Sequence, residues 1–259
     1  MRTSQLTTTY IQALIFAALG IRCVVAYARE RDRRSADLAW AAGLFGLSSL
    51  ISAVSSTIWD QTLLEEPPRA LTLLSSAIIF VSIYAFLRFL SDFIPFPKWV
   101  HGIIIAATAG NIVLSVIERP DIRFDPQRGI VPIPGVDNPI SYRAYIGYVL
   151  LYLAVAFGVL ALAFAVYGFR TAGLARYRML FIASGFFLLF VIIGLLPRLL
   201  FGNPSLETIR NISNVARYVA LFAAPLLFLG FAPPAWVRRL VGRADQGGPP
   251  LDRRVRGAA

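Results

Sequence analysis

One stretch near the end of the chain places an arginine among apolar residues, with polar side chains on both sides of it. In the run ETIRNISNVARYVALFAAP, Asn211, Asn214, Arg217 and Tyr218 recur at steps of three and four residues, which puts them on one face of a helix. A guanidinium binds a carboxylate or a phosphate through two parallel hydrogen bonds. The residue types and their spacing therefore predict either a site for an anionic ligand or an internal ion pair.

Further polar side chains are expected at the same end of the helices. They are Arg198, Asp60, Tyr145, Tyr148 and Tyr152. Together with the arginine face they predict an aromatic, hydrogen-bonding pocket that opens outward. Two interpretations stay open, because tyrosines also form interfacial belts and asparagines also join helices. In one, Arg217 binds a small-molecule ligand; in the other, Arg217 pairs with Asp60 in a structural network.

The elements that position these residues follow from the composition. Hydrophobic residues make up 57% of the 259 residues and charged residues 15%, whereas soluble proteins carry about 25% charged residues. Seven apolar runs are long enough to cross a bilayer as helices. They cover residues 10–28, 38–59, 70–90, 100–117, 145–169, 179–201 and 213–231. Because only helices and closed barrels satisfy their backbone in lipid, the sequence predicts an all-α, seven-transmembrane helical bundle in contact with the lipid bilayer.

The distribution of basic residues predicts how this bundle is oriented. Most of the 25 Lys and Arg residues follow the odd-numbered runs or lie in the C-terminal tail. Loops rich in Lys and Arg stay in the cytoplasm. We therefore expect an external N-terminus at 1–9, a transmembrane domain at 10–240 and a disordered, basic cytoplasmic tail at 241–259, in the plasma (inner) membrane.

The sequence lacks the residues that several kinds of chemistry need. His101 is the only histidine and Cys23 the only cysteine, so no metal site of the usual kinds, no cofactor and no catalysis are expected. The only lysine, Lys98, lies in an inner loop, which excludes covalent retinal. The arginines flank membrane spans rather than form a patch, so no nucleic-acid partner is expected.

The connections and the packing carry weaker signals. In the external loop 118–141, two short strand-like pieces flank a turn-rich segment, which predicts a hairpin that is either a lid over the pocket or a loop without function. Small residues recur in two runs, including Gly102 and Gly110 in the fourth and Gly158 and Gly168 in the fifth, and predict close helix contacts there. Pro225 should kink the last helix.

The end of the last run resembles a known family. The run ARYVA at 216–220, the prolines of GFAPP at 230–234 and the basic exit WVRR at 236–239 are similar to the last span of seven-transmembrane N-terminal input modules of bacterial, particularly actinobacterial, sensor proteins. In that family, such an exit leads into histidine kinase, diguanylate cyclase, PAS or GAF domains. Residues 244–259 are too short and too polar to form one. The resemblance therefore implies a sensory input bundle that either works through a cytoplasmic signalling protein or lacks its output domain.

Three functions remain in view at this point. The first is a receptor-like membrane protein that binds a small, lipid-like or anionic ligand from the outer side. The second is a small-molecule transporter or channel, although few carboxylates lie within the runs and no internal repeat is evident. The third is a structural or chaperone-like membrane partner that needs no ligand.

Overall fold

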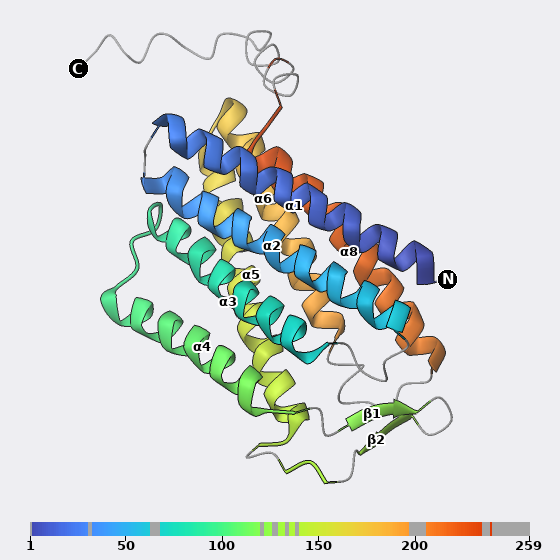
Figure 1. Ribbon diagram of the computed structural model, residues 1–259. Helices are drawn as coiled ribbons and strands as arrows, with labels where there is room; N and C mark the ends of the chain where they lie inside the picture. Colours follow the sequence, from blue (N-terminus) through green and yellow to red (C-terminus); the bar gives the residue numbers. More distant parts are fainter. Residues whose placement is uncertain are drawn as a thin grey trace, which may run out of the picture.

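Long helices dominate the fold. The computed structural model describes residues 2–30, 33–62, 68–119, 122–125, 129–132, 135–137, 140–196, 206–234 and 239. Within these ranges the chain forms seven helices: α1 (Arg2–Glu30), α2 (Arg33–Thr62), α3 (Arg69–Ser91), α4 (Lys98–Ile117), α5 (Tyr142–Arg170), α6 (Gly173–Leu195) and α8 (Leu206–Phe231). Figure 1 shows them side by side as a bundle. The prediction of an all-α chain is confirmed.

Five of these helices are long and apolar enough to cross a membrane. Their apolar segments are Ala36–Ser55, Arg69–Ser91, Lys98–Ile117, Arg143–Arg170 and Gly173–Leu195. The apolar parts of α1 and α8 are shorter, Tyr10–Val25 and Tyr218–Phe231. Several apolar helices of this length in one chain indicate a multi-pass membrane protein.

The sixth helix occupies a different range from the predicted run 179–201. It begins at Gly173, directly after a two-residue connection from α5, and its last residue is Leu195; residues 197–201 lie outside the described part. Gly173 has a φ of 62°, a value that favours glycine and allows the sharp turn. The first turns of α6 carry Arg176 and Arg178, which is why the apolar run starts later than the helix.

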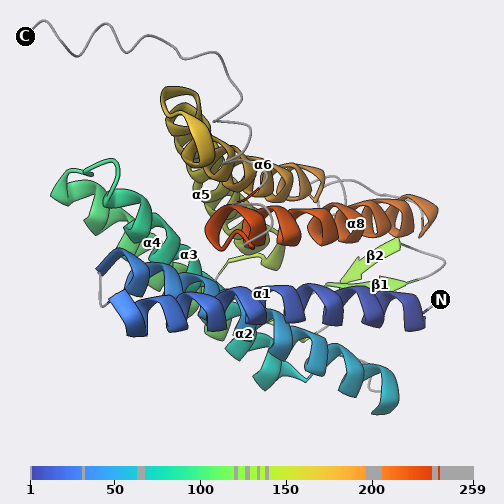
Figure 2. The same ribbon diagram turned by 90° about the horizontal axis from the view of Figure 1, so that it is seen from above.

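The helices form two groups that meet along α1 and α8. The group α1, α2 and α3 packs in sequence order, as does the group α5, α6 and α8, and α1 also packs against α8. In Figures 1 and 2, α4 lies at the margin of the bundle beside α3. It contacts α3 along part of its length and approaches α5 closely at only a few positions. Of the five long apolar helices, α4 is the least buried.

A cluster of phenylalanines forms the core between the two groups. Phe86 and Phe89 from α3 meet Phe164 from α5, Phe186 from α6 and Phe231 from α8, with neighbouring ring centroids 5.3–6.3 Å apart. Aromatic pairs at such distances contribute roughly 0.5–1.5 kcal/mol each beyond the area they bury. The cluster thus ties the end of α8 to α3, α5 and α6.

Helices α1 and α2 approach each other so closely that only glycine fits at the contact. A Cβ atom on Gly46 would lie 2.8 Å from the Ala17 nitrogen, and one on Gly20 would lie 2.7 Å from the Gly43 Cα. Small residues allow such contacts between membrane helices, where dispersion forces replace the hydrophobic effect. The contact fixes α1 on α2.

The two ends of the bundle contain different elements. The hairpin end contains the start of α1 and the strands β1 (Ile122–Asp125) and β2 (Gly129–Pro132), which form an antiparallel pair with Arg123 opposite Val131. This pair occupies the segment from which a hairpin is expected. The opposite, exit end contains the α1–α2, α3–α4 and α5–α6 connections and the end of α8.

Candidate ligand site

Two of the predicted site tyrosines join α5 to α4. The Tyr145 hydroxyl lies 2.9 Å from the Ser115 hydroxyl, and the Tyr152 hydroxyl lies 2.8 Å from the Thr108 hydroxyl. Tyr145 is buried and Tyr152 is half-buried. Both tyrosines are therefore engaged with α4 rather than with the polar face of α8.

Three other predicted site residues are exposed. Tyr148 on α5 has its hydroxyl near Gly110 of α4, and the residue is 38% exposed. On α8, Asn211 is exposed and Tyr218 is 58% exposed. Since α6 packs between α5 and α8, the described contacts do not bring the α5 tyrosines and the α8 polar residues together.

The structure does not describe the side chains of the remaining predicted site residues. Asp60 belongs to α2, and Asn214 and Arg217 belong to α8, but the structure does not describe their side chains. Arg198 falls within residues 197–205, which are not described at all. Whether Arg217 meets Asp60 or a ligand stays a prediction.

The tyrosine contacts reveal a polar stripe on α4 that the sequence interpretation missed. Its members recur at steps of three and four residues, which places them on one face of the helix. They are Thr108, Asn111, Ser115 and, just after the helix end, Glu118, and all four are buried. We call these four residues with Tyr145 and Tyr152 the polar ladder. The signal was present as helical periodicity, but each Thr, Asn and Ser alone is commonly interhelical glue.

The opposite face of α4 explains why the stripe turns inward. Ile103, Ile105, Val113, Val116 and Ile117 are all exposed and apolar. Lipid is the favourable surrounding for such a face, whereas hydroxyl, amide and carboxylate groups need partners inside the protein. The helix is thus oriented with its apolar side to lipid and its polar ladder towards α5.

Asn111 contributes an unpaired acceptor to the ladder. Its side chain is 0% exposed, its Nδ2 donates to the Ala107 carbonyl at 2.8 Å, and its Oδ1 has no hydrogen-bond partner in the described part of the chain. If the nitrogen and oxygen of the Asn111 side-chain amide were exchanged, two oxygens would face each other at the Ala107 carbonyl. The free acceptor therefore belongs to Oδ1.

Glu118 contributes a second unpaired group at the hairpin end. Its side chain is only 3% exposed, and neither carboxylate oxygen has a hydrogen-bond partner among the residues that the structure describes. It lies close enough to Tyr145 for an electrostatic interaction. Its backbone N–H donates to the Leu114 carbonyl and ends the helix. A buried carboxylate is costly unless it is paired, so this group marks a binding site more strongly than any hydroxyl of the ladder.

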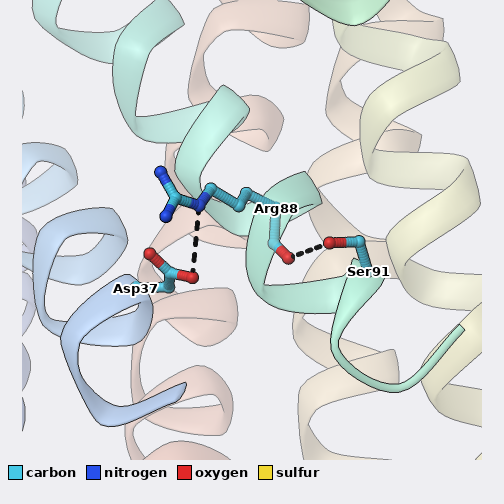
Figure 3. A network of polar contacts seen from close by, with 3 residues as sticks. All are labelled: Asp37, Arg88 and Ser91. Atoms are coloured by element: carbon cyan, nitrogen blue, oxygen red, sulfur yellow. Dashed lines mark hydrogen bonds and ion pairs between the residues drawn. The ribbon is translucent and has the colours of Figure 1, made fainter. Parts of the chain in front are cut away.

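The other buried charge has a clear partner. Asp37 near the start of α2 lies 3.4 Å from the Arg88 Nε on α3, and the Ser91 hydroxyl donates to the Arg88 carbonyl at 2.6 Å (Figure 3). The 3.4 Å contact is an ion pair by distance without hydrogen-bond geometry, since that carboxylate oxygen has no hydrogen bond of its own. The arrangement is structural, because it joins α2 to α3 at the exit end.

Two arginines hold the end of α8. Arg178 on α6 donates from Nε to the Gly230 carbonyl at 3.1 Å and from a terminal nitrogen to the Phe231 carbonyl at 3.2 Å. Arg22 on α1 donates to the Pro233 carbonyl at 3.4 Å and lies over the Phe228 ring. The last carbonyls of a helix lack partners and carry partial negative charge, so cations stabilise them.

An apolar groove lies between α1 and α2. It has a volume of about 350 Å³, and its walls, which include Gly20, Gly43, Leu47 and Leu50, are almost wholly apolar. Such walls suit an acyl chain but carry few groups that could select a particular ligand.

Neither a metal-binding cluster in the described part of the chain nor a similarity to known proteins assigns a further site or function. Within the described residues, no three His, Cys, Asp or Glu side chains gather closely enough to hold a metal ion. No protein-family model matches the chain, and neither a curated protein nor a solved structure is significantly similar to it. The polar ladder is therefore assigned from its own chemistry.

Proposed function

We propose that this chain is a receptor-like, seven-transmembrane sensory protein that binds a small or lipid-like ligand from the outer side and has no catalysis of its own. In this proposal the hairpin end faces outward and the exit end faces the cytoplasm of the cell, across the plasma membrane. The excess of Lys and Arg in the exit-end connections supports the orientation. The resemblance of the chain's exit to sensor input modules supports the sensory role.

One observation carries the ligand-binding part of the proposal. Among the residues that the structure describes, Glu118 and Asn111 are buried polar side chains whose oxygens have no hydrogen-bond partner, Asn111 on the face of α4 turned to α5 and Glu118 just after the end of this helix. Buried polar groups are nearly always hydrogen-bonded, and an exception calls for a physical explanation such as a binding role. The polar ladder is the proposed ligand site.

The packing supplies a route from this site to the exit end. The marginal helix α4 packs on α3, and α3 contributes Phe86 and Phe89, whose rings contact Phe231 at the end of α8. A shift of α4 on ligand binding would therefore act on α3 and then on the last turn of α8. In the proposal, a cytoplasmic signalling protein reads the position of this exit.

The orientation is tested by reporter fusions. Fusions after Arg34 and after Arg243 should report the cytoplasm, and a fusion after Arg128 should report the exterior. The opposite result for any of the three would overturn the seven-span arrangement or its direction.

The ligand site is tested by what co-purifies with the protein. We expect mass spectrometry to detect a small molecule or lipid that is retained by the wild type and lost in Glu118→Gln and Asn111→Leu. The matched control is Asp137→Asn, which removes a carboxylate from an exposed position in the same connection. Equal retention by all four proteins, or retention by none, would contradict binding at the polar ladder.

A transporter is the second candidate, and the buried Glu118 favours it. Carboxylates within membrane domains commonly line substrate and proton paths. A transporter should accumulate its substrate in proteoliposomes along an imposed gradient, whereas a receptor should bind without flux. Glu118-dependent uptake would replace the receptor proposal.

A further inference from the structure

The unpaired groups of the polar ladder are all acceptors. Glu118 offers two carboxylate oxygens, and Asn111 offers its Oδ1. Apart from one N–H of the Asn111 amide, the donors of the ladder are already used: the Asn111 Nδ2 donates to the Ala107 carbonyl, and the Ser115 hydroxyl donates to the Asn111 carbonyl at 2.6 Å and lies 2.9 Å from the Tyr145 hydroxyl. A carboxylate or phosphate ligand would bring oxygens to oxygens. The site calls for a donor that carries positive charge.

An arginine of α3 lies at the same end of α4 and bonds its backbone. Arg69 donates to the Val116 carbonyl at 3.0 Å, which holds its guanidinium at the end of α4. Arg119, the next residue after Glu118, is exposed. Within the described part of the chain, neither arginine donates a hydrogen bond to the Glu118 carboxylate. Both oxygens of the Glu118 carboxyl are therefore open to a donor that the described side chains do not supply.

The donor set distinguishes an ammonium group from a metal ion. Calcium takes six to eight oxygen ligands and magnesium demands octahedral geometry. At Glu118 the described residues supply one carboxylate and the Tyr145 and Ser115 hydroxyls, which already pair with each other, while the Asn111 amide oxygen lies about two helical turns away along α4. A primary ammonium needs one counter-charge and presents three N–H donors, which matches this set.

We propose that the hairpin end of the polar ladder binds a primary ammonium group, with the Glu118 carboxylate as its counter-charge. The inference rests on the proposed function and names the ligand class of the same site. The ammonium belongs either to a small amine or to a lipid headgroup. Both sources fit the position of Glu118, which follows the last turn of a membrane-length helix, at the level where headgroups lie.

The test uses the full chain in phosphatidylglycerol nanodiscs and an amine-free phosphate buffer. Three six-carbon probes of equal chain length differ only in the head: hexylamine, hexanol and hexanoate. A ligand that binds only the folded state raises Tm with its concentration. Hexylamine should raise the Tm of the wild type and of Asp137→Asn in a saturable manner, and the other two probes should not.

The variant Glu118→Gln removes the counter-charge and keeps the shape. Without any probe, its Tm should equal or exceed that of the wild type, because it no longer buries a charge, and this confirms that it folds. Its response to hexylamine should be lost. An equal response of Glu118→Gln and the wild type would overturn the inference, and so would a response to sodium chloride that matches the response to hexylamine.

A comparison of two nanodisc compositions distinguishes the two sources of ammonium. Phosphatidylethanolamine and phosphatidylglycerol discs with the same acyl chains are compared without hexylamine. A higher Tm in phosphatidylethanolamine, absent in Glu118→Gln, assigns the ammonium to the lipid; a response to hexylamine alone assigns it to a soluble amine. A Glu118-dependent response to hexanol or hexanoate would overturn the ammonium class but leave the proposed receptor function, whereas the loss of any ladder-dependent ligand would overturn both.

Discussion

The Tyr145 hydroxyl lies 2.9 Å from the Ser115 hydroxyl and joins α5 to the face of α4 that ends in Glu118. The contact between Tyr152 and Thr108 repeats this arrangement two turns further along both helices. Because α4 has few close backbone contacts with α5, these side-chain pairs carry much of the attachment between them. The ladder is thus both the proposed ligand site and the side-chain attachment of α4 to α5.

The first prediction concerns this attachment. Tyr145→Phe and Tyr152→Phe should each lower the free energy of unfolding by about 0.5–1.5 kcal/mol, because each leaves a hydroxyl of α4 without its partner. Tyr177→Phe on α6 is the control, since that tyrosine is 46% exposed. Thermal or denaturant unfolding in detergent measures the difference. If the double variant is as stable as the control, the hydroxyl pairs do not hold α4.

The second prediction separates two glycines one turn apart on α2. Gly46→Ala should destabilise the fold by roughly 1–3 kcal/mol, because the new Cβ would lie 2.8 Å from backbone atoms of α1. Gly43→Ala has no atom within 4 Å of its new Cβ and should be neutral or stabilising by up to about 1 kcal/mol. Melts of the two variants measure this contrast. Equal Tm values would show that α1 and α2 are not in this close contact.

The third prediction addresses the end of α8. Arg178→Ala should free the Gly230 and Phe231 carbonyls and loosen the last turn, so the backbone amide of Ala232 should exchange with deuterium faster. Arg178→Lys should restore part of the protection, because one ammonium can reach only part of the arginine's two contacts. The exposed Arg176 on the same helix provides the control Arg176→Ala. Unchanged exchange in Arg178→Ala would remove the arginine from this role.

The fourth prediction concerns Arg217, the residue from which the sequence predicts an anion site. If Arg217 pairs with a buried Asp60, Arg217→Gln should destabilise the fold by about 3–5 kcal/mol, and Asp60→Asn should rescue it. If Arg217 binds an anion, the same variant should lose ligand-dependent stability and otherwise stay folded. Melts of both single variants and the double variant, with and without co-purified molecules, separate the two. Wild-type behaviour in all of them would exclude both partners.

Much of the architecture could be predicted from the sequence, because apolar length is a local property. All seven apolar runs lie largely within helices, and the segment with turn residues between 118 and 141 contains the paired strands. The sixth helix differs from its predicted range because its first turns carry two arginines, of which Arg178 bonds the end of α8, a contact that no local pattern records.

Helix contacts and the site were harder to predict, because they depend on which helices become neighbours. Of the small residues expected to mediate close packing, Gly168 does lie tightly against Leu180, but Gly102 has open space around it. The tightest contacts with the backbone of a neighbouring helix use Gly20 and Gly46 instead. Tyr145 and Tyr152 were recognised as polar residues on one side of a helix, but their partners on α4 depend on the arrangement of α3, α4 and α5. Only that arrangement distinguishes Glu118 from an ordinary loop carboxylate.

The fifth prediction is the most direct test of the central claim, that occupancy of the polar ladder moves α4 within the bundle. Spin labels at Ile103→Cys on α4 and Tyr177→Cys on α6, both exposed positions, are placed in a Cys23→Ala background, and their distance distribution is measured by pulsed electron spin resonance in nanodiscs. Hexylamine should shift the distribution in the wild-type ladder and in Asp137→Asn but leave it unchanged in Glu118→Gln. A distribution that stays the same while hexylamine raises Tm would mean that the ladder binds without moving α4, and it would contradict the receptor account.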